Sequence, residues 1–161
     1  DVPLNEEGRQ MVEEAGQRYL NTHFDICYCS PLTRARETAE AVLRGRNVPI
    51  ITDARLEEMG FGVCEGSMDF MVNPENPIHD LFCAPEKYVT PPEGGESLPA
   101  LYARTGAFLK EVVDPELRQG KDILLVGHGA MNASIVCQIR GIPLKDFWST
   151  KMKNAELVRL L

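Results

Sequence analysis

Four short apolar runs divide the chain. They are residues 24–29, 49–52, 123–126 and 157–161, and each has the length of a strand, far below that of a membrane-spanning helix. Continuous apolar runs are typical of strands that are covered on both faces, which occur mainly in parallel sheets. The pattern therefore predicts four strands of one mostly parallel sheet.

Segments with helical spacing of apolar residues separate these runs. Asn5 and Ser97 are suited to cap two of the helices, because their side-chain oxygens can accept from free backbone N–H groups. Two further helices are predicted over residues 32–43 and 130–139. Strands that alternate with helices in this way predict an α/β fold in which helices connect parallel strands.

The run at 123–126 leads into Gly127-His128-Gly129. Parallel strands bring the residues that follow them to the carboxyl edge of the sheet, where ligands bind. The two glycines allow unusual backbone angles and close approach by a ligand, and the N–H groups that open the next helix favour an anion. A tight turn with a packed histidine has the same sequence pattern, so this motif alone does not establish catalysis.

A second candidate anion site follows the first predicted strand. Ser30 is suited to cap the next helix, and Pro31 is suited to be its first residue. This start places Arg34 and Arg36 in the first turns of the helix, near the sheet edge. The pattern predicts a guanidinium group that is available to an anion.

A glycine-rich loop over residues 55–66 carries the adjacent carboxylates Glu57 and Glu58. A carboxyl group beside a bound phosphate is held in its neutral form by the neighbouring negative charge, and can donate a proton to a leaving oxygen. Glu58 is the candidate for this role. A solvated acidic loop would explain the same residues if they stood alone.

Taken in order, these motifs resemble those of the histidine phosphatase superfamily. The segments that carry the resemblance are residues 1–8, Ser30-Pro31-Leu32-Thr33-Arg34-Ala35, Leu56-Glu57-Glu58, Gly94-Gly95-Glu96-Ser97 and Val126-Gly127-His128-Gly129. The resemblance implies a three-layer α/β/α fold of the phosphoglycerate mutase type, with a mostly parallel sheet. It also implies a single domain over residues 1–161, with a variable cap at residues 67–95.

The resemblance further implies a phosphomonoester phosphatase that uses a phosphohistidine intermediate and neither metal nor cofactor. It assigns catalysis to Glu58 and His128, and phosphate binding to Arg34, His128 and Gly129. Guanidinium groups suit this task because they match phosphate oxygens in two-pronged fashion. The residues expected to support the pocket are Ser30, Glu96 and Ser97.

The nucleophile of this family is a histidine in an Arg-His-Gly motif on an amino-terminal strand, and no such motif occurs among the 161 residues. His23 precedes a predicted strand, and His79 lies in a proline-rich segment, so neither fits the role. We therefore expect the nucleophile upstream of residue 1, on a strand beside the one that ends before His128. The chain without that strand is expected to fold poorly and to be inactive.

Two alternatives to the phosphatase function remain. They are phosphoryl transfer of the phosphoglycerate mutase type and a catalytically inactive phosphate-binding module.

The cap segment at 67–95 is rich in proline and contains scattered apolar side chains. These side chains either form an apolar wall above the phosphate or pack among themselves, and the sequence leaves both possibilities open. They are Met68, Phe70, Met71, Leu81, Phe82 and Tyr88.

The formal net charge is −7, which argues against general binding to nucleic acid or to anionic membranes. A small phosphorylated substrate is the expected partner, and the choice between monomer and homodimer stays open.

The five cysteines form no C-x-x-C pair. We expect their thiols to be reduced and buried, where they pack as small hydrophobic side chains, as in a cytoplasmic protein. A metal site made from Cys27, Cys29 and a histidine is not favoured.

Overall fold

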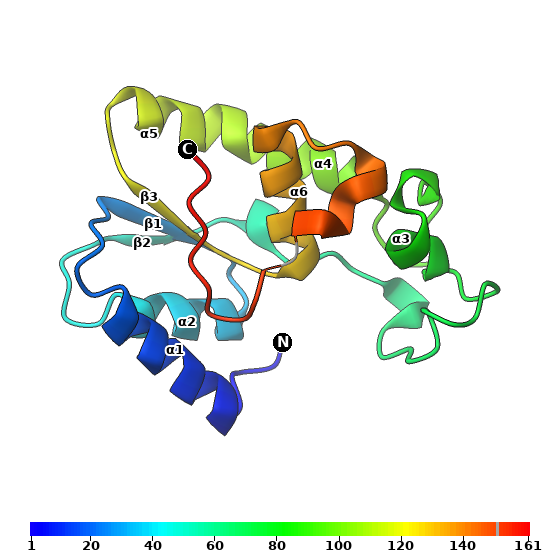
Figure 1. Ribbon diagram of the computed structural model, residues 1–161, viewed down its shortest axis with the longest axis horizontal. Helices are drawn as coiled ribbons and strands as arrows, with labels where there is room; N and C mark the ends of the chain where they lie inside the picture. The colour runs from blue at the N-terminus through cyan, green and yellow to red at the C-terminus, as the bar shows by residue number, and fades with distance from the viewer. Residues whose placement is uncertain (151) are drawn as a thin grey trace.

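The computed structural model describes residues 1–150 and 152–161. Strands β1 (Ile26–Cys29), β2 (Ile50–Thr52) and β3 (Ile123–Val126) form one parallel sheet in the order β2-β1-β3 (Figure 1). Cys29 is in register with Thr52 on one side and with Val126 on the other. The carboxyl ends of all three strands therefore meet at one edge of the sheet.

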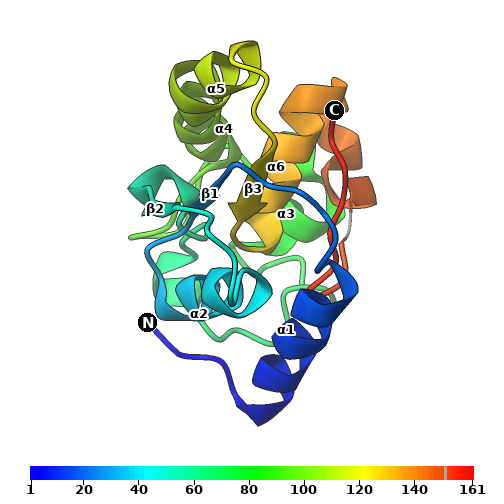
Figure 2. The ribbon, with the colours of Figure 1, turned by 90° about the vertical axis from the view of Figure 1, so that its left-hand side faces the viewer.

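Helices cover both faces of this sheet (Figure 2). One face carries α2 (Thr33–Val42), with α1 (Glu6–Arg18) packed beside it. The other face carries α4 (Leu98–Phe108), α5 (Asp114–Arg118) and α6 (Gly129–Arg140). The predicted three-layer α/β/α arrangement is confirmed.

Strand β1 is buried at all four positions, because its side chains alternate between the two covered faces. Ile26 and Tyr28 join the larger hydrophobic cluster, whereas Cys27 and Cys29 join the cluster beneath α2. Burial raises the pKa of the Cys27 thiol to about 12. These two cysteines are inert parts of the core, as predicted.

The remaining cysteines differ from one another. Cys137 is buried, as expected, but Cys64 is half-buried and Cys83 is exposed. The prediction of five buried thiols is thus wrong for the two cysteines that lie in or beside the long loop between β2 and α4. Loops cover the surface rather than the core, which is why the sequence rule for cysteine failed there.

Two of the predicted helix caps are confirmed. The Asn5 side chain accepts from the Gly8 N–H at 2.8 Å, and the Ser97 hydroxyl accepts from the Ala100 N–H at 3.2 Å. Helix α4 continues through a π-helical turn at Leu109–Val113 into α5. Helix α6 ends where Gly141 adopts a left-handed conformation with φ of 64°, which glycine tolerates best.

The predicted cap of α2 is wrong. The helix begins at Thr33 with Leu32 as N-cap, and the Ser30 hydroxyl instead accepts from the Leu32 N–H at 3.3 Å in the preceding turn. The Thr33 N–H donates to both oxygens of the Asp1 carboxylate at 3.0 Å. A carboxylate from a distant part of the chain therefore satisfies the donor that Ser30 was expected to satisfy.

The strand predicted at 157–161 is absent from the described sheet. The backbone groups of this segment bond to side chains instead. The Leu157 N–H donates to the Tyr19 hydroxyl oxygen at 3.0 Å, and the Arg159 carbonyl accepts from the Arg140 guanidinium at 3.0 Å. These side-chain partners replace the neighbouring strand that the apolar pattern predicted.

The segment at 67–95 contains α3 (His79–Cys83), at one end of the molecule in Figure 1. Ile78, Leu81 and Tyr88 are buried in the larger hydrophobic cluster. The segment therefore packs on the main core rather than only on itself. No helix among the described residues combines the length and the apolar character needed to cross a membrane.

Candidate active site

His128 lies at the carboxyl edge of the sheet, directly after β3, as the N-cap residue of α6. Its side chain is almost fully buried, and the ring nitrogen Nε2 has no hydrogen-bond partner. A Cβ atom built at Gly127 would lie 1.8 Å from Cε of Met131. A side chain at position 127 would therefore require the end of the Met131 side chain to move. The expectation of unusual backbone angles at these two glycines is wrong, since neither Gly127 nor Gly129 has a positive φ.

The electrostatic surroundings of His128 favour a neutral ring. Burial is the largest cause that lowers the pKa of this imidazole, the positive charges of Arg34 and Arg104 contribute as well, and together they bring it to about 4. In the tautomer that carries its proton on Nε2, a buried neutral imidazole can donate a hydrogen bond to a ligand oxygen.

Arg34 lies in the first turn of α2 and is half-buried. Over the described chain, no carboxylate pairs with its guanidinium group. Arg36, the other arginine that the sequence placed near the sheet edge, is exposed and does not line the cavity described below. Arg34 is therefore the guanidinium that is available to an anion.

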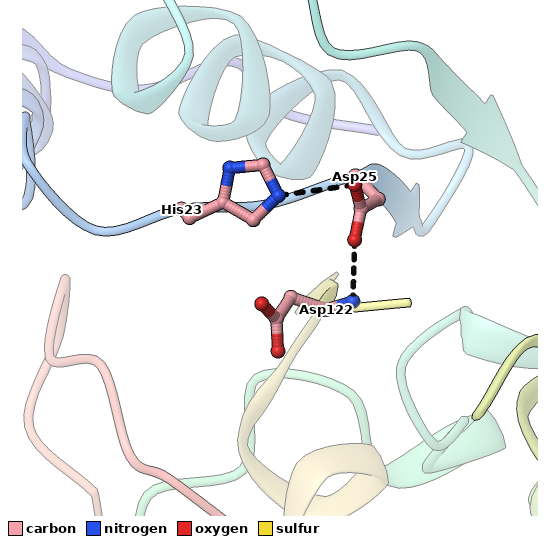
Figure 3. A group of neighbouring side chains, drawn as sticks. All are labelled: His23, Asp25 and Asp122. Carbon is pink, nitrogen blue, oxygen red and sulfur yellow. Dashed lines mark hydrogen bonds and ion pairs between the residues drawn. The ribbon is translucent and has the colours of Figure 1, made fainter. Parts of the chain in front are cut away.

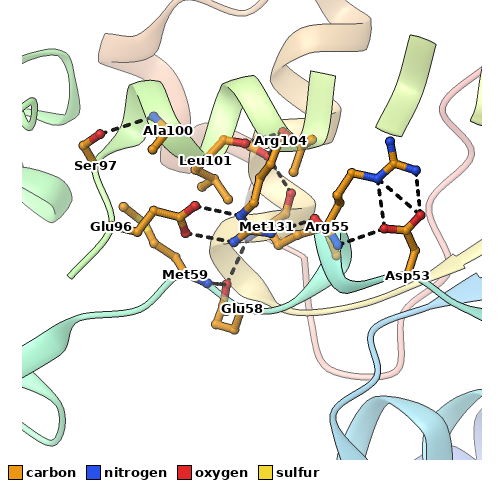
Figure 4. A network of polar contacts seen from close by, with 12 residues as sticks. Asp53, Arg55, Glu58, Met59, Glu96, Ser97, Ala100, Leu101, Arg104 and Met131 are labelled. Atoms are coloured by element: carbon orange, nitrogen blue, oxygen red, sulfur yellow. Dashed lines mark hydrogen bonds and ion pairs between the residues drawn. The ribbon is translucent and has the colours of Figure 1, made fainter. Parts of the chain in front are cut away.

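Glu58 lies over the amino end of α6 (Figure 4). Its Oε1 accepts from the backbone N–H groups of Met59 at 2.8 Å and Met131 at 3.1 Å, and its Oε2 accepts from the Ala130 N–H at 3.3 Å. Helix N-termini favour negative charge, so the backbone positions this carboxylate. The sequence predicted an anion at the start of α6, and in this structure that anion is the Glu58 side chain.

Glu96 binds the guanidinium of Arg104 of α4 (Figure 4). The guanidinium donates from Nε at 2.7 Å and from Nη2 at 2.8 Å to the two Glu96 oxygens. Its Nη1 donates to the carbonyl of Arg55 at 2.6 Å. Arg104 was missed by sequence reasoning because a mid-helix arginine eight residues after a glutamate matches no motif.

One cavity of about 760 Å³ brings several candidate residues together. Arg34, Glu58, His128 and Gly129 all line it. The three expected support residues lie outside the lining: Ser30 in the turn before α2, Glu96 on Arg104, and Ser97 at the α4 cap.

The cavity also extends along β3 and toward the cap. Leu124, Leu125 and Val126 of β3 line it, together with residues of α1. Of the six apolar cap residues singled out from the sequence, Met71 and Phe82 reach the cavity. The expected apolar wall is therefore smaller than the sequence suggested.

A second group of polar side chains lies at the opposite edge of the sheet (Figure 3). Asp25 Oδ1 lies 3.0 Å from Nε2 of His23, and Asp25 Oδ2 accepts from the Asp122 N–H at 2.7 Å. In the part of the chain that the structure describes, His23, Asp25 and Asp122 are the one cluster with metal-ligand chemistry. Their hydrogen bonds join the segments that enter β1 and β3, and Cys27 and Cys29 take no part in it.

The sequence profile of the histidine phosphatase superfamily (branch 1) matches residues 1–161. The chain belongs to this superfamily, and the resemblance drawn from the motifs is confirmed.

Three relatives show how broad this family is. A 2,3-bisphosphoglycerate-dependent phosphoglycerate mutase of Cytophaga hutchinsonii is 31% identical over 91% of this chain and 70% of that protein. Phosphoserine phosphatase 1 of Hydrogenobacter thermophilus is 29% identical over 96% of this chain and 72% of that protein. The structure of Bacillus stearothermophilus YhfR superimposes with a TM-score of 0.82 at 32% identity, covering 96% of this chain and 76% of the other.

Proposed function

We propose that this chain carries the phosphate pocket and the proton donor of a phosphomonoester phosphatase that works through a phosphohistidine, without metal or cofactor. The observation that supports this most is the convergence of Arg34, Glu58 and His128 on one cavity. The relatives include both mutases and phosphatases, so the family supports phosphoryl transfer in general.

In this proposal Arg34 holds two phosphate oxygens, because its guanidinium is half-buried and pairs with no described carboxylate. His128 contributes its unpartnered Nε2 to a third oxygen. Gly129 lines the same cavity as the first residue of α6, and backbone N–H groups at the start of a helix favour an anion. These three contacts would offset the charge that spreads over the phosphoryl oxygens in the transition state.

The nucleophile is proposed to be a histidine on a strand upstream of residue 1 that pairs with β3. Within the described sheet, β3 has β1 as its one neighbour, and Leu124, Leu125 and Val126 of β3 line the cavity whereas no residue of β1 does. A strand placed there would end beside His128, because parallel strands bring their carboxyl ends to the same edge.

The reaction then has two steps. The histidine nitrogen attacks phosphorus, the bond from phosphorus to the ester oxygen breaks, and the leaving alcohol takes the proton of Glu58. A water molecule next gives a proton to Glu58, and its oxygen attacks phosphorus. The bond from nitrogen to phosphorus breaks, which releases inorganic phosphate and restores the histidine.

The test compares Glu58→Gln with Glu57→Gln, because Glu57 is an exposed neighbour outside the cavity lining. The assay uses the natural full-length protein with 4-nitrophenyl phosphate, whose leaving group needs no proton, and with an alkyl phosphomonoester, whose leaving group does. We expect Glu58→Gln to lower kcat/KM for the alkyl ester at least about 100-fold, and for the aryl ester much less. Glu57→Gln should leave both rates near those of the natural protein.

Equal losses on both substrates would contradict the role of Glu58 as proton donor. Interconversion of 3- and 2-phosphoglycerate without release of phosphate would favour the mutase alternative. Phosphate binding without any turnover would favour the inactive binding module.

A further inference from the structure

We propose that this site prefers phosphomonoesters with an apolar, aromatic leaving group, and that Phe82 and Trp148 are the residues that determine the preference. The inference rests on the proposed phosphatase function. It adds a substrate class and assigns specificity to two side chains that the phosphate chemistry does not use.

Phe82 of α3 and Trp148 of the 3-10 helix Leu144–Thr150 stack on each other. Their ring centroids are 5.3 Å apart, and the planes differ by 6°. Both residues line the cavity that also contains Arg34 and His128. A phosphate held by those two residues would therefore have an aromatic wall within the same enclosure.

This wall is fixed by contacts on several sides. The Trp148 Nε1–H donates to the carbonyl of Leu81 at 2.7 Å, which sets the orientation of the indole ring. The same hydrogen bond joins the segment at 67–95 to the 3-10 helix Leu144–Thr150. Phe147 packs edge-on against Trp148 at 4.8 Å, and Phe70 packs on Phe82 at 4.3 Å. A wall whose rotamers are already fixed loses little entropy when a ligand packs on it.

The charges in the segment at 67–95 also favour an apolar leaving group. Residues 67–95 contain five carboxylates and one lysine, and Met71 and Phe82 are the members of this segment that reach the cavity. A leaving group with its own carboxylate would find no cation on this wall, and burying an unpaired charge there is costly. Apart from Arg34, the cation among the described lining residues is Lys153, on the carboxyl-terminal segment.

The chain offers a direct readout, because Trp148 is its single tryptophan. The probes are three phosphonates that cannot be hydrolysed: methylphosphonate, phenylphosphonate and 2-carboxyethylphosphonate. They are titrated into the full-length protein by calorimetry, with Trp148 fluorescence followed in parallel. We expect phenylphosphonate to bind at least about 10-fold more tightly than methylphosphonate, because the phenyl ring buries apolar surface. We expect it alone to change the tryptophan emission strongly.

Two variants separate the wall from the phosphate contacts. Phe82→Ala should reduce the preference for phenylphosphonate to below about 3-fold and leave methylphosphonate binding unchanged. Trp148→Phe, followed by calorimetry, should weaken the preference less, because it keeps a ring and loses the hydrogen bond to Leu81. Met68→Ala is the matched control, since Met68 belongs to the same segment but is 89% exposed and lies outside the cavity lining.

The binding data distinguish failure of the aromatic preference from failure of the phosphate pocket. Equal affinities for methyl- and phenylphosphonate would overturn the proposed preference and leave the phosphate pocket intact. Tightest binding of 2-carboxyethylphosphonate would also overturn it and would implicate Lys153. Failure of all three phosphonates to bind would refute the proposed function itself, together with the preference that rests on it.

Discussion

The protonation state of His128 provides the most quantitative test of the site. Burial, with Arg34 and Arg104 as smaller causes, lowers its pKa from 6.5 to about 4. Each pKa unit corresponds to about 1.4 kcal/mol, so protonating the ring costs up to about 3.5 kcal/mol more in the folded protein than in the unfolded chain. At pH 7 only about 0.1% of the folded molecules should carry a charged His128.

This shift makes the folded protein less stable as the pH falls. The folded pKa lies below the unfolded value, so the unfolded chain binds more protons between pH 6.5 and about 4, and folding free energy is lost as the pH falls through that window. Between pH 7 and pH 5 the loss due to His128 should be about 1–2 kcal/mol, after allowance for water in the cavity. His128→Gln should remove this part of the pH dependence.

The assay is urea unfolding of the full-length protein at pH 7 and pH 5, alongside an NMR titration of the histidine rings. His23→Gln is the control, because His23 is exposed. Arg34→Gln should raise the pKa of His128 by less than about one unit, since burial is the largest cause of the shift. An imidazole signal of His128 that titrates near 6.5 would refute the reasoning, as would an unchanged pH dependence in His128→Gln.

Three further substitutions test separate contacts. Arg34→Lys should weaken phosphate or vanadate binding about 10-fold by calorimetry, because one ammonium group cannot form the two-pronged contact; unchanged affinity would exclude Arg34 as a ligand. Glu96→Gln should lower the unfolding free energy by about 1–3 kcal/mol in urea, since Arg104 loses a half-buried charged partner; no loss would show that the pair contributes little. Gly127→Ala should cost about 1–3 kcal/mol by thermal unfolding, because its Cβ forces the end of Met131 aside; an unchanged Tm would show that Met131 relaxes freely.

Local signals in the sequence predicted much of the fold. The caps at Asn5 and Ser97 could be predicted because each depends on a side chain and a backbone group three residues apart. The apolar runs predicted the three strands of the sheet. The turn residues after two of these strands predicted the positions of His128 and Arg34. These features depend on short stretches of chain, which a pattern can describe.

Features that depend on distant partners were missed. The cap of α2 is completed by the carboxylate of Asp1, and the segment at 157–161 bonds to the side chains of Tyr19 and Arg140 instead of joining the sheet. The stacking of Trp148 on Phe82 likewise joins residues far apart in the sequence. No local pattern shows which distant side chain will supply a partner, so these contacts required the structure.

A crystal structure of the protein with bound vanadate or phosphate is the decisive test of the proposed phosphate pocket. We expect one anion inside the 760 Å³ cavity, with two of its oxygens on the Arg34 guanidinium and another within hydrogen-bond distance of Nε2 of His128. An anion bound outside this cavity, or one that leaves both Arg34 and His128 without a contact, would contradict it.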